Sequence, residues 1–357
     1  MPNNKLSLAV AGSRKTQSIV DQCGQVGREN KVLIVTFTQA NQEEIKSRLS
    51  TNAGGSGNIT VLGWYGFLIN DFAKPFVPFK FKGRRVEGFN FEGNPSRYAR
   101  GERRFFDSQG AVYACELARL SYELMGLSAG ALVNRLECIY DYIFIDEVQD
   151  LSGYDWEIID ELLSSSINID MVGDVRQAVL STNPRGRKNK GYAYAEAIHW
   201  FREKERQGVL EIEERNVTYR CRPEIASFSD KIFGNELDFP STFSENHFET
   251  GHDGIFTIRP DQVEEYVRRY NPQCLRYSSA SGKTLGLEFL NFKACKGMTF
   301  ERVLIIPTNP IKELVCKGVP LKPTSAASFY VAVTRAKQSV ALVMNYTGSE
   351  EIEAWEP

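Results

Sequence analysis

The stretch that most constrains the fold is Tyr142–Asp150, which reads YIFIDEVQD. Its apolar residues end abruptly at two adjacent carboxylates, Asp146 and Glu147, and a short apolar run with such a boundary is typical of a buried strand in a parallel sheet. In open α/β sheets, ligands bind just outside the carboxyl ends of the strands. A carboxylate there can hold Mg²⁺ on a nucleotide, while its neighbour orients or deprotonates an attacking water. The alternative is a strand followed by a solvated acidic turn.

A second strand-and-loop unit lies at the start of the chain. Residues Lys5–Val10 predict a strand and Gln17–Cys23 predict a helix, with the loop Ala11–Thr16 (AGSRKT) between them. This arrangement is typical of a phosphate cradle. Backbone N–H groups face the phosphates, Lys15 reaches the β and γ oxygens, and the Thr16 hydroxyl ligates Mg²⁺.

The loop departs from the usual pattern at Arg14, where glycine normally precedes the lysine. A non-glycine residue at positive φ costs on the order of 1 kcal/mol, so a reshaped phosphate loop and an ordinary strand–turn–helix both stay open. Another segment, Ser281–Thr284, reads SGKT. Its apolar strand follows the lysine instead of preceding it, so we interpret it as a polar turn.

Composition narrows the class of protein. A chain of 357 residues, 42% hydrophobic and 25% charged, is typical of a soluble protein with two domains. No apolar run is long enough to span a membrane, and the N-terminus lacks a signal-peptide pattern. The seven cysteines form no CxxC pair, which argues against a disulfide framework or a zinc site. We therefore expect a cytoplasmic protein. The net charge of −2 excludes no partner.

Several short motifs follow one another in a fixed order. They are AGSRKT (11–16), VTFTQANQEEIKSRL (35–49), LGWYGFL (62–68), FIDEVQD (144–150), MVGDVRQAV (171–179), TYRCRPEI (218–225), KACKGMTFERVLI (293–305) and YVAVTRAK (330–337). In this order and spacing they resemble the superfamily 1 DNA helicases of the UvrD/Rep/PcrA type. The resemblance covers nearly the whole chain, and its later motifs are the most specific.

The resemblance implies ATP and Mg²⁺ as cofactors. Lys15, Thr16 and Asp146 would hold Mg·ATP, and Glu147 would activate water. Gln177 would sense the γ-phosphate, and Tyr219 would stack on adenine. Arg220 and Arg335 would stabilise charge on the phosphoryl group. The full nucleotide-binding set is Gly12, Ser13, Arg14, Lys15, Thr16, Gln177, Tyr219, Arg220 and Arg335.

The resemblance also implies contacts to nucleic acid from both domains. The residues concerned are Thr36, Phe37, Thr38, Trp64 and Tyr65 in the first domain, and Lys296, Gly297 and Thr299 in the second. Stacking on aromatic rings tolerates any base sequence. The alternative for Phe37 and Trp64 is packing in the core, because both have apolar neighbours.

Residues Lys80–Arg104 are basic and aromatic, with eight Lys or Arg side chains against three acids. They look like an insertion at the place where the family has its first accessory subdomain. Such a composition favours single-strand binding, and a solvated loop docked on the parent domain is the alternative.

The chain also departs from the family in two further ways. After Gln177, where the family usually has a tyrosine and a base-stacking tryptophan, the chain has Ala178–Asn183. The segment from Gly234 to Phe289 is too short for the large second accessory subdomain. We therefore expect a minimal form that lacks the large accessory subdomains.

For the fold we expect an α/β protein with two RecA-like P-loop NTPase domains, parallel sheets and an ATP site at their interface. The first would span residues 1–184, with the basic insertion at about 73–107, and the second residues 185–357. The expected function is an ATP-dependent DNA helicase or translocase whose ATP hydrolysis is stimulated by single-stranded DNA and which moves 3′ to 5′. Its expected partner is single-stranded or partly duplex DNA. The alternative is an ATP-gated regulatory or DNA-binding subunit of a nuclease complex, for example in antiviral defence.

Overall fold

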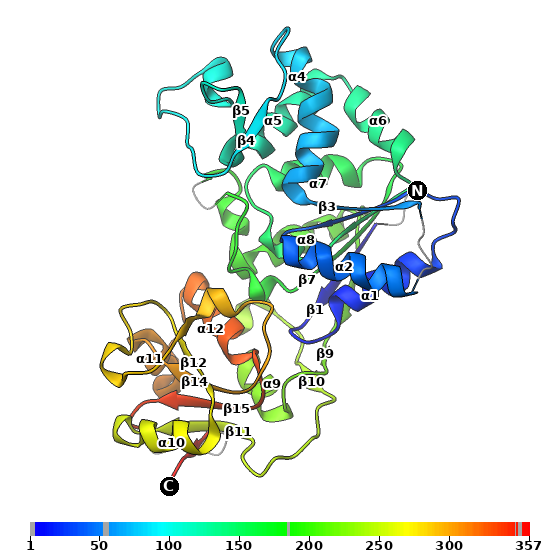
Figure 1. Cartoon of the computed structure of the whole chain (residues 1–357). Helices are drawn as coiled ribbons and strands as arrows, with labels where there is room; N and C mark the ends of the chain where they lie inside the picture. The colour runs from blue at the N-terminus through cyan, green and yellow to red at the C-terminus, as the bar shows by residue number, and fades with distance from the viewer. Residues whose placement is uncertain (1–3, 53–56, 184–185, 347, 349–351) are drawn as a thin grey trace.

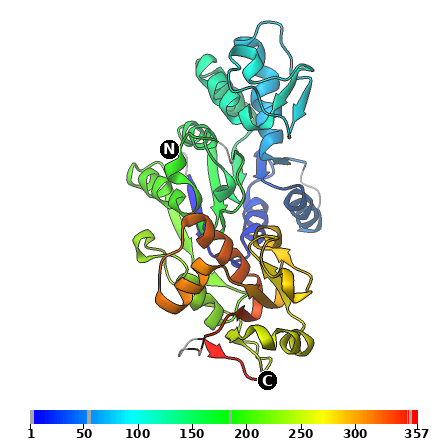
Figure 2. The same ribbon diagram turned by 90° about the vertical axis from the view of Figure 1, so that its left-hand side faces the viewer.

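The computed structural model describes residues 4–52, 57–183, 186–346, 348 and 352–357. Figures 1 and 2 show two α/β bodies, with a helical lobe projecting from the first body on the side away from the second. This confirms the predicted fold class of two RecA-like domains with parallel sheets.

The first domain is built on a six-stranded parallel sheet. Its strands, in spatial order, are β3 (Ile59–Gly63), β2 (Val32–Thr36), β6 (Tyr142–Ile145), β7 (Asn168–Gly173), β1 (Lys5–Ala9) and β8 (Glu211–Arg215). All five residues of β2 are buried, since both faces of the sheet are covered by helices.

Alternate residues of β2 supply the two hydrophobic cores of this domain. Val32 and Ile34 pack with the helices α1 (Lys15–Gln25) and α2 (Gln39–Asn52). Residues Leu33 and Val35 belong to the larger core on the opposite face, which includes residues of α7 (Asp155–Leu163) and α8 (Ala197–Arg206). This period of two is the geometry of an extended strand between two helical layers.

The boundary predicted at residue 184 is wrong. Strand β8 pairs in parallel with β1, and Trp200 and Phe201 of α8 pack in the first domain's core. The chain therefore stays with the first domain up to Arg215. The error arose because the segment after residue 184 carries no motif that marks its neighbour in space.

The helical lobe is larger than the predicted insertion at 73–107. It consists of α3 (Trp64–Phe67), a π-helical turn (Leu68–Ala73), α4 (Lys74–Lys80), β4 (Gly88–Asn90), β5 (Ala111–Tyr113), α5 (Ala114–Leu127) and α6 (Ala131–Ile139). Phe76 and Val77 of α4 are buried with residues of α5, so α4 is part of the lobe's core and not a surface loop.

The second domain also contains a six-stranded parallel sheet. Its strands, in spatial order, are β13 (Leu290–Asn291), β12 (Gln273–Arg276), β14 (Phe300–Ile306), β15 (Ala336–Val343), β11 (Gly254–Ile258) and β16 (Glu353–Ala354). Its helices are α9 (Pro223–Asp230), α10 (Val263–Tyr270), α11 (Asn309–Lys317) and α12 (Pro323–Val333), and β9 (Val217–Thr218) pairs with β10 (Phe243–Ser244) beside them.

One local prediction is confirmed in this domain. The SGKT segment forms a turn, with Gly282 in the left-handed region and a single 3₁₀ turn at Lys283–Leu285, as predicted. The residues before Arg335 are helical in α12, which ends at Val333. None of the helices in the described part of the chain is both long and apolar enough to cross a membrane.

Candidate nucleotide and nucleic-acid sites

The loop between β1 and α1 has the backbone shape of a phosphate cradle. Gly12 has φ 79°, and a Cβ built on it would lie 2.6 Å from Arg220 Cβ and 2.6 Å from Thr218 Oγ1. Only glycine fits there, because the second domain approaches the loop backbone directly. The Tyr219 amide also donates to Gly12 O at 3.1 Å, so the cradle and the second domain share a hydrogen bond.

Arg14 occupies the left-handed region in the position where the family has glycine. Its φ of 61° and ψ of 38° immediately precede α1, and its carbonyl accepts the Ser18 amide at 3.1 Å. The loop thus keeps its path, at a backbone cost of about 1–2 kcal/mol. The Arg14 guanidinium lies 4.0 Å from the ring centroid of Tyr219, the residue predicted to stack on adenine.

The predicted Mg²⁺ ligands lie next to each other. Thr16 Oγ1 is 3.4 Å from Asp146 Oδ2, and Lys15 Nζ lies over the loop, 3.4 Å from Val10 O. A hydroxyl and a carboxylate are hard oxygen ligands that suit Mg²⁺. No cluster of three or more His, Cys, Asp or Glu side chains suited to a metal occurs among the described residues.

The pKa values of the two adjacent carboxylates shift in opposite directions. Burial, with repulsion from Glu147, raises the pKa of Asp146 to about 7. Burial also acts on Glu147, but Lys296 and Lys15 outweigh it and lower the pKa of Glu147 to about 2. Glu147 therefore stays ionised at neutral pH, which is the state that a general base needs.

Lys296 of the second domain bridges two acids of the first. Its Nζ lies 2.8 and 2.6 Å from the Asp150 carboxylate oxygens and 3.2 Å from Glu147 Oε2. The three side chains are largely buried, and burial of the lysine is outweighed by the two carboxylates, which raise the pKa of Lys296. Lys296, which is predicted to contact nucleic acid, joins the second domain to Glu147 and Asp150 of the first.

Two arginines of the second domain, Arg335 and Arg220, lie against first-domain residues Gln177 and Gly12. Arg335 is 2% exposed and donates from Nη2 to Gln177 Oε1 at 2.8 Å. Arg220 donates to Thr334 O at 3.1 Å. Burial and the neighbouring Arg220 lower the pKa of Arg335 to about 10, so it remains charged at neutral pH. Paired cations beside a phosphate cradle suit the stabilisation of phosphoryl charge.

A buried polar network ties Gln177 to the body of the second domain. Asp174 Oδ2 accepts from Gln177 Nε2 at 2.8 Å and from the Tyr330 hydroxyl at 3.2 Å. Arg176 donates to Asp230 of α9 at 2.9 Å. Through these contacts the loop after β7 lies between the two domains and touches both.

The predicted nucleotide residues therefore converge on one interdomain cavity of about 900 Å³. Asp146 and Tyr219 do not line it themselves, but they contact Thr16 and Arg14, which do. The predicted residues that line the cavity are Gly12, Ser13, Arg14, Lys15, Thr16, Thr38, Glu147, Gln177, Arg220, Lys296, Gly297 and Arg335.

The residues predicted to contact nucleic acid do not converge in the same way. Trp64 is buried, and its indole N–H donates to Asp155 at 2.7 Å, which favours the alternative of core packing. Thr36 is buried. Thr38 lines the interdomain cavity of about 900 Å³, which we refer to as the nucleotide cavity. Tyr65 is partly buried and donates to Thr182 O at 2.7 Å. Thr299 is exposed.

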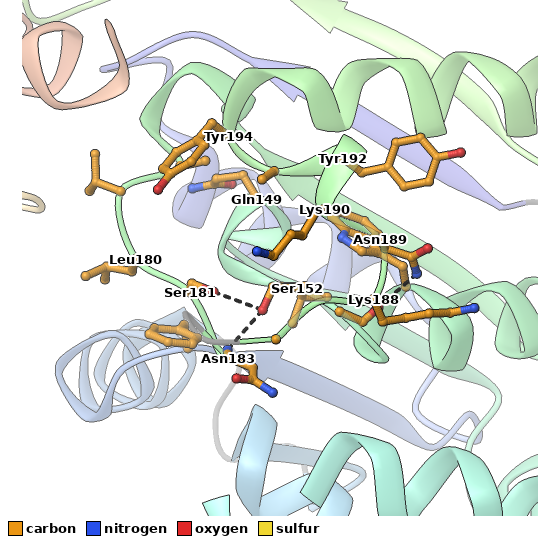
Figure 3. A pocket seen from close by; sticks show the side chains of 18 of the residues that line it. Gln149, Ser152, Leu180, Ser181, Asn183, Lys188, Asn189, Lys190, Tyr192 and Tyr194 are labelled. Carbon is orange, nitrogen blue, oxygen red and sulfur yellow. Dashed lines mark hydrogen bonds between the residues drawn. The ribbon is translucent and has the colours of Figure 1, made fainter. Parts of the chain in front are cut away.

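Phe37 lines a second cavity of about 560 Å³, which borders the segment after Gln177 (Figure 3). Ser152 Oγ joins this segment to the first domain by accepting from Ser181 Oγ and from the Asn183 amide, both at 2.9 Å. Figure 3 shows Lys190 pointing into the cavity above Ser152. Lys293 of the second domain also lines it.

Most residues that surround this second cavity are not among the predicted site residues. They include Lys188, Asn189, Lys190, Tyr192 and Tyr194, from the run KNKGYAY. Tyr194 has φ 59°, an uncommon strained conformation that is found at functional sites. Two lysines followed by two tyrosines, each at alternate positions, were the signal that could have marked this run.

Comparisons with known proteins agree with the fold. The model of the UvrD/REP helicase N-terminal domain matches residues 106–182. No curated protein sequence matches the chain. The structure is similar to arterivirus nonstructural protein 10 (helicase), with TM-score 0.50 and 15% identity over 96% of this chain and 60% of that one. It is similar to the same arterivirus helicase in complex with DNA, with TM-score 0.50 and 16% identity over 97% and 61%.

This chain spans about three fifths of the length of those solved helicases. The family match lies in the part of the first domain that contains Asp146, Glu147 and Gln177. In fold and in motifs, the chain therefore resembles the UvrD-like superfamily 1 helicases.

Proposed function

We propose that this protein is an ATP-dependent DNA helicase or translocase. The observation that carries the proposal is the convergence of Lys15, Thr16 and Glu147 from one domain with Arg220 and Arg335 from the other. A site shared between two domains makes their closure depend on what the site binds.

The residues suggest a division of labour in hydrolysis. Lys15 and the amides of the cradle bind the β and γ oxygens, and Mg²⁺ held by Thr16 and Asp146 would neutralise phosphate charge. Glu147 accepts the proton of the water whose oxygen bonds to the γ-phosphorus. The bond from that phosphorus to the bridging oxygen then breaks. Arg335 and Arg220 offset the charge that develops.

The second cavity supports a nucleic-acid tract beside this site. It combines the aromatic rings of Phe37 and Tyr194 with Lys190 and Lys293, which is the chemistry that binds single strands. Leu180 and Lys293 line both cavities, so a strand in one cavity and a nucleotide in the other would touch common residues. Movement from 3′ to 5′ stays a prediction.

ATP hydrolysis with and without single-stranded DNA tests the proposal. We expect stimulation by DNA in the native chain and a loss of at least about 100-fold in Lys15→Ala and Glu147→Gln. Lys317→Ala, on an exposed part of α11, is the matched control and should keep full activity. Full turnover in Glu147→Gln would contradict the role of the base.

One observation favours the alternative of an ATP-gated regulatory subunit. Glu147 forms an ion pair with Lys296 and accepts a hydrogen bond from the Gln149 side-chain amide. The carboxylate that we propose as the general base is therefore held by two partners. A switch would bind ATP tightly with little turnover, with or without DNA. The nuclease partner and the antiviral role stay predictions.

A further inference from the structure

The helical lobe contains a basic segment that the nucleotide site does not use. We refer to residues 91–104, between β4 and β5, as the lobe loop. In Figure 1 the lobe loop leaves β4 and runs on the side of the lobe away from α6. The loop is anchored at its far end by Phe105 and Phe106, which are both 3% exposed. It is therefore a built part of the lobe and not a loose tail.

The basic side chains of this region fall into two groups. Three of them hold the lobe together: Lys80 pairs with Glu123 at 2.9 Å, Arg84 with Glu102 at 3.0 Å and Arg104 with Glu116 at 2.6 Å. The others are exposed and make no ion pair with another described residue; they are Lys82, Arg85, Arg97, Arg100 and Arg103. Three unpaired arginines in seven residues leave a local positive charge that the lobe itself does not neutralise.

Aromatic rings accompany these arginines at the surface. Tyr98 is 83% exposed and Phe91 is 68% exposed, although burial of large rings normally stabilises a fold. Tyr98, Arg100 and Arg103 line one hollow together. Asp107 also lines it, but its carboxylate accepts from Asn90 at 2.8 Å and from the Gln109 and Ala111 amides at 2.9 Å, so its charge is used to shape the turn.

The lobe loop is continuous with the second cavity. Phe91 lies 4.2 Å from Phe89 and 5.6 Å from Tyr65, measured between ring centroids. Tyr65 donates to Thr182 O, and the next residue, Asn183, lines the second cavity. A row of aromatic contacts thus leads from the cavity between the domains to the start of the lobe loop.

We propose that the lobe loop is a second binding surface for single-stranded nucleic acid, extending the tract of the second cavity. Arg97, Arg100 and Arg103 contact phosphates, while Tyr98 and Phe91 offer faces for stacked bases. Single strands are favoured over a duplex because exposed rings need unpaired bases to stack on. The inference deepens the proposed function and rests on it.

Fluorescence anisotropy with strands of two lengths tests this surface. In the native full chain, a strand of about 20 nucleotides should bind at least about tenfold more tightly than one of about 8, because only the longer one reaches the lobe. The triple change of Arg97, Arg100 and Arg103 to Ala should remove that gain and lower the salt slope by about 2. Tyr98→Ala should weaken the long strand at least about fivefold.

A matched variant separates this effect from net charge. Changing Lys312, Lys317 and Lys322 to Ala removes the same three charges elsewhere, and should leave the length effect intact. ATP hydrolysis without nucleic acid should be unchanged in every variant, which also shows that each one is folded. Parallel titrations with deoxythymidine and uridine strands show whether the surface accepts DNA, RNA or both, and either supports the proposal.

Several outcomes overturn it. Equal affinity of the native chain for long and short strands does so, as does a loss of the length effect in the lysine control. If the triple arginine variant loses affinity only for a duplex probe and not for single strands, the lobe loop binds duplex and the single-strand assignment is wrong. If the native chain neither hydrolyses ATP nor binds any strand, the proposed function itself fails, which differs from a working ATPase without the length effect.

Discussion

The two cavities between the domains are organised differently. In the nucleotide cavity, Glu147, Gln177 and Arg335 each hydrogen-bond or pair with another side chain, and most of these contacts cross between the domains. In the second cavity, Lys190 and Lys293 make no ion pair with another described residue. The nucleotide cavity is therefore preorganised by its own contacts, whereas the second cavity keeps cations available for a charged ligand.

The contrast is consistent with the two roles that we propose. Phosphoryl transfer needs groups held to within a fraction of an ångström, because its transition-state charge is stabilised by fixed dipoles and cations. Binding a strand of any sequence needs charge and ring faces but little fixed geometry. The difference predicts that changes at the nucleotide cavity affect turnover, whereas changes at the second cavity affect affinity.

The largest expected effect concerns Trp64, which belongs to neither cavity. Because its ring is buried and its N–H satisfies Asp155, Trp64→Ala should lower the free energy of unfolding by about 3–5 kcal/mol. Urea unfolding measures the loss. Trp64→Phe should keep most of the stability, with an affinity for single strands within about twofold of native. If Trp64→Phe is stable but selectively loses affinity for DNA, Trp64 contacts nucleic acid and is not only a core residue.

Lys296 gives the next largest effect and tests the boundary between the cavities. Lys296→Ala leaves Glu147 and Asp150 close together without their cation, so hydrolysis should fall about 10- to 100-fold even without DNA. Lys190→Ala, at a residue that lines the second cavity but not the nucleotide cavity, is the control and should keep this basal rate but weaken strand binding. Steady-state rates and anisotropy on both variants make the comparison. The reverse pattern would assign Lys296 to nucleic acid.

Acid sensitivity should arise away from both cavities, at His252. This ring stacks 4.1 Å from Phe256 and 3.7 Å from Tyr270, and burial, with the nearby Arg302, lowers its pKa to about 4. Since the unfolded chain takes up the proton first, stability is lost as pH falls, by about 2 kcal/mol between about pH 7.5 and pH 5. Urea unfolding of His252→Phe at both pH values should show this loss reduced. An equal loss in both chains would place the titrating group elsewhere.

The smallest effect is expected at Arg14. Arg14→Gly relieves the left-handed strain and frees the Tyr219 ring for a nucleobase, so KM for ATP should fall about two- to fivefold. Arg28→Gly, an exposed change outside the loop, serves as the control. A rise in KM would show that the Arg14 guanidinium contacts the nucleotide itself.

The clustering of the predicted nucleotide residues around one cavity follows largely from sequence. Lys15, Asp146 and Gln177 each follow a parallel strand of the first sheet, and the carboxyl ends of such strands meet at one edge. A residue's position relative to its strand therefore fixes its place in the site. The sequence did not indicate which aromatic residues are buried. Trp64 is buried and Tyr98 is exposed, and this difference depends on their neighbours in space.

By itself, the sequence determined the α/β class, the two parallel sheets and the residues of the phosphate cradle, because strand ends and turn residues are local properties. Only the tertiary structure decided that β8 completes the first sheet, that Lys296 pairs with Glu147 and Asp150, and that Trp64 is buried. These outcomes depend on contacts between residues far apart in the chain. Whether a ring or a cation serves the core or a ligand is set by its neighbours in space.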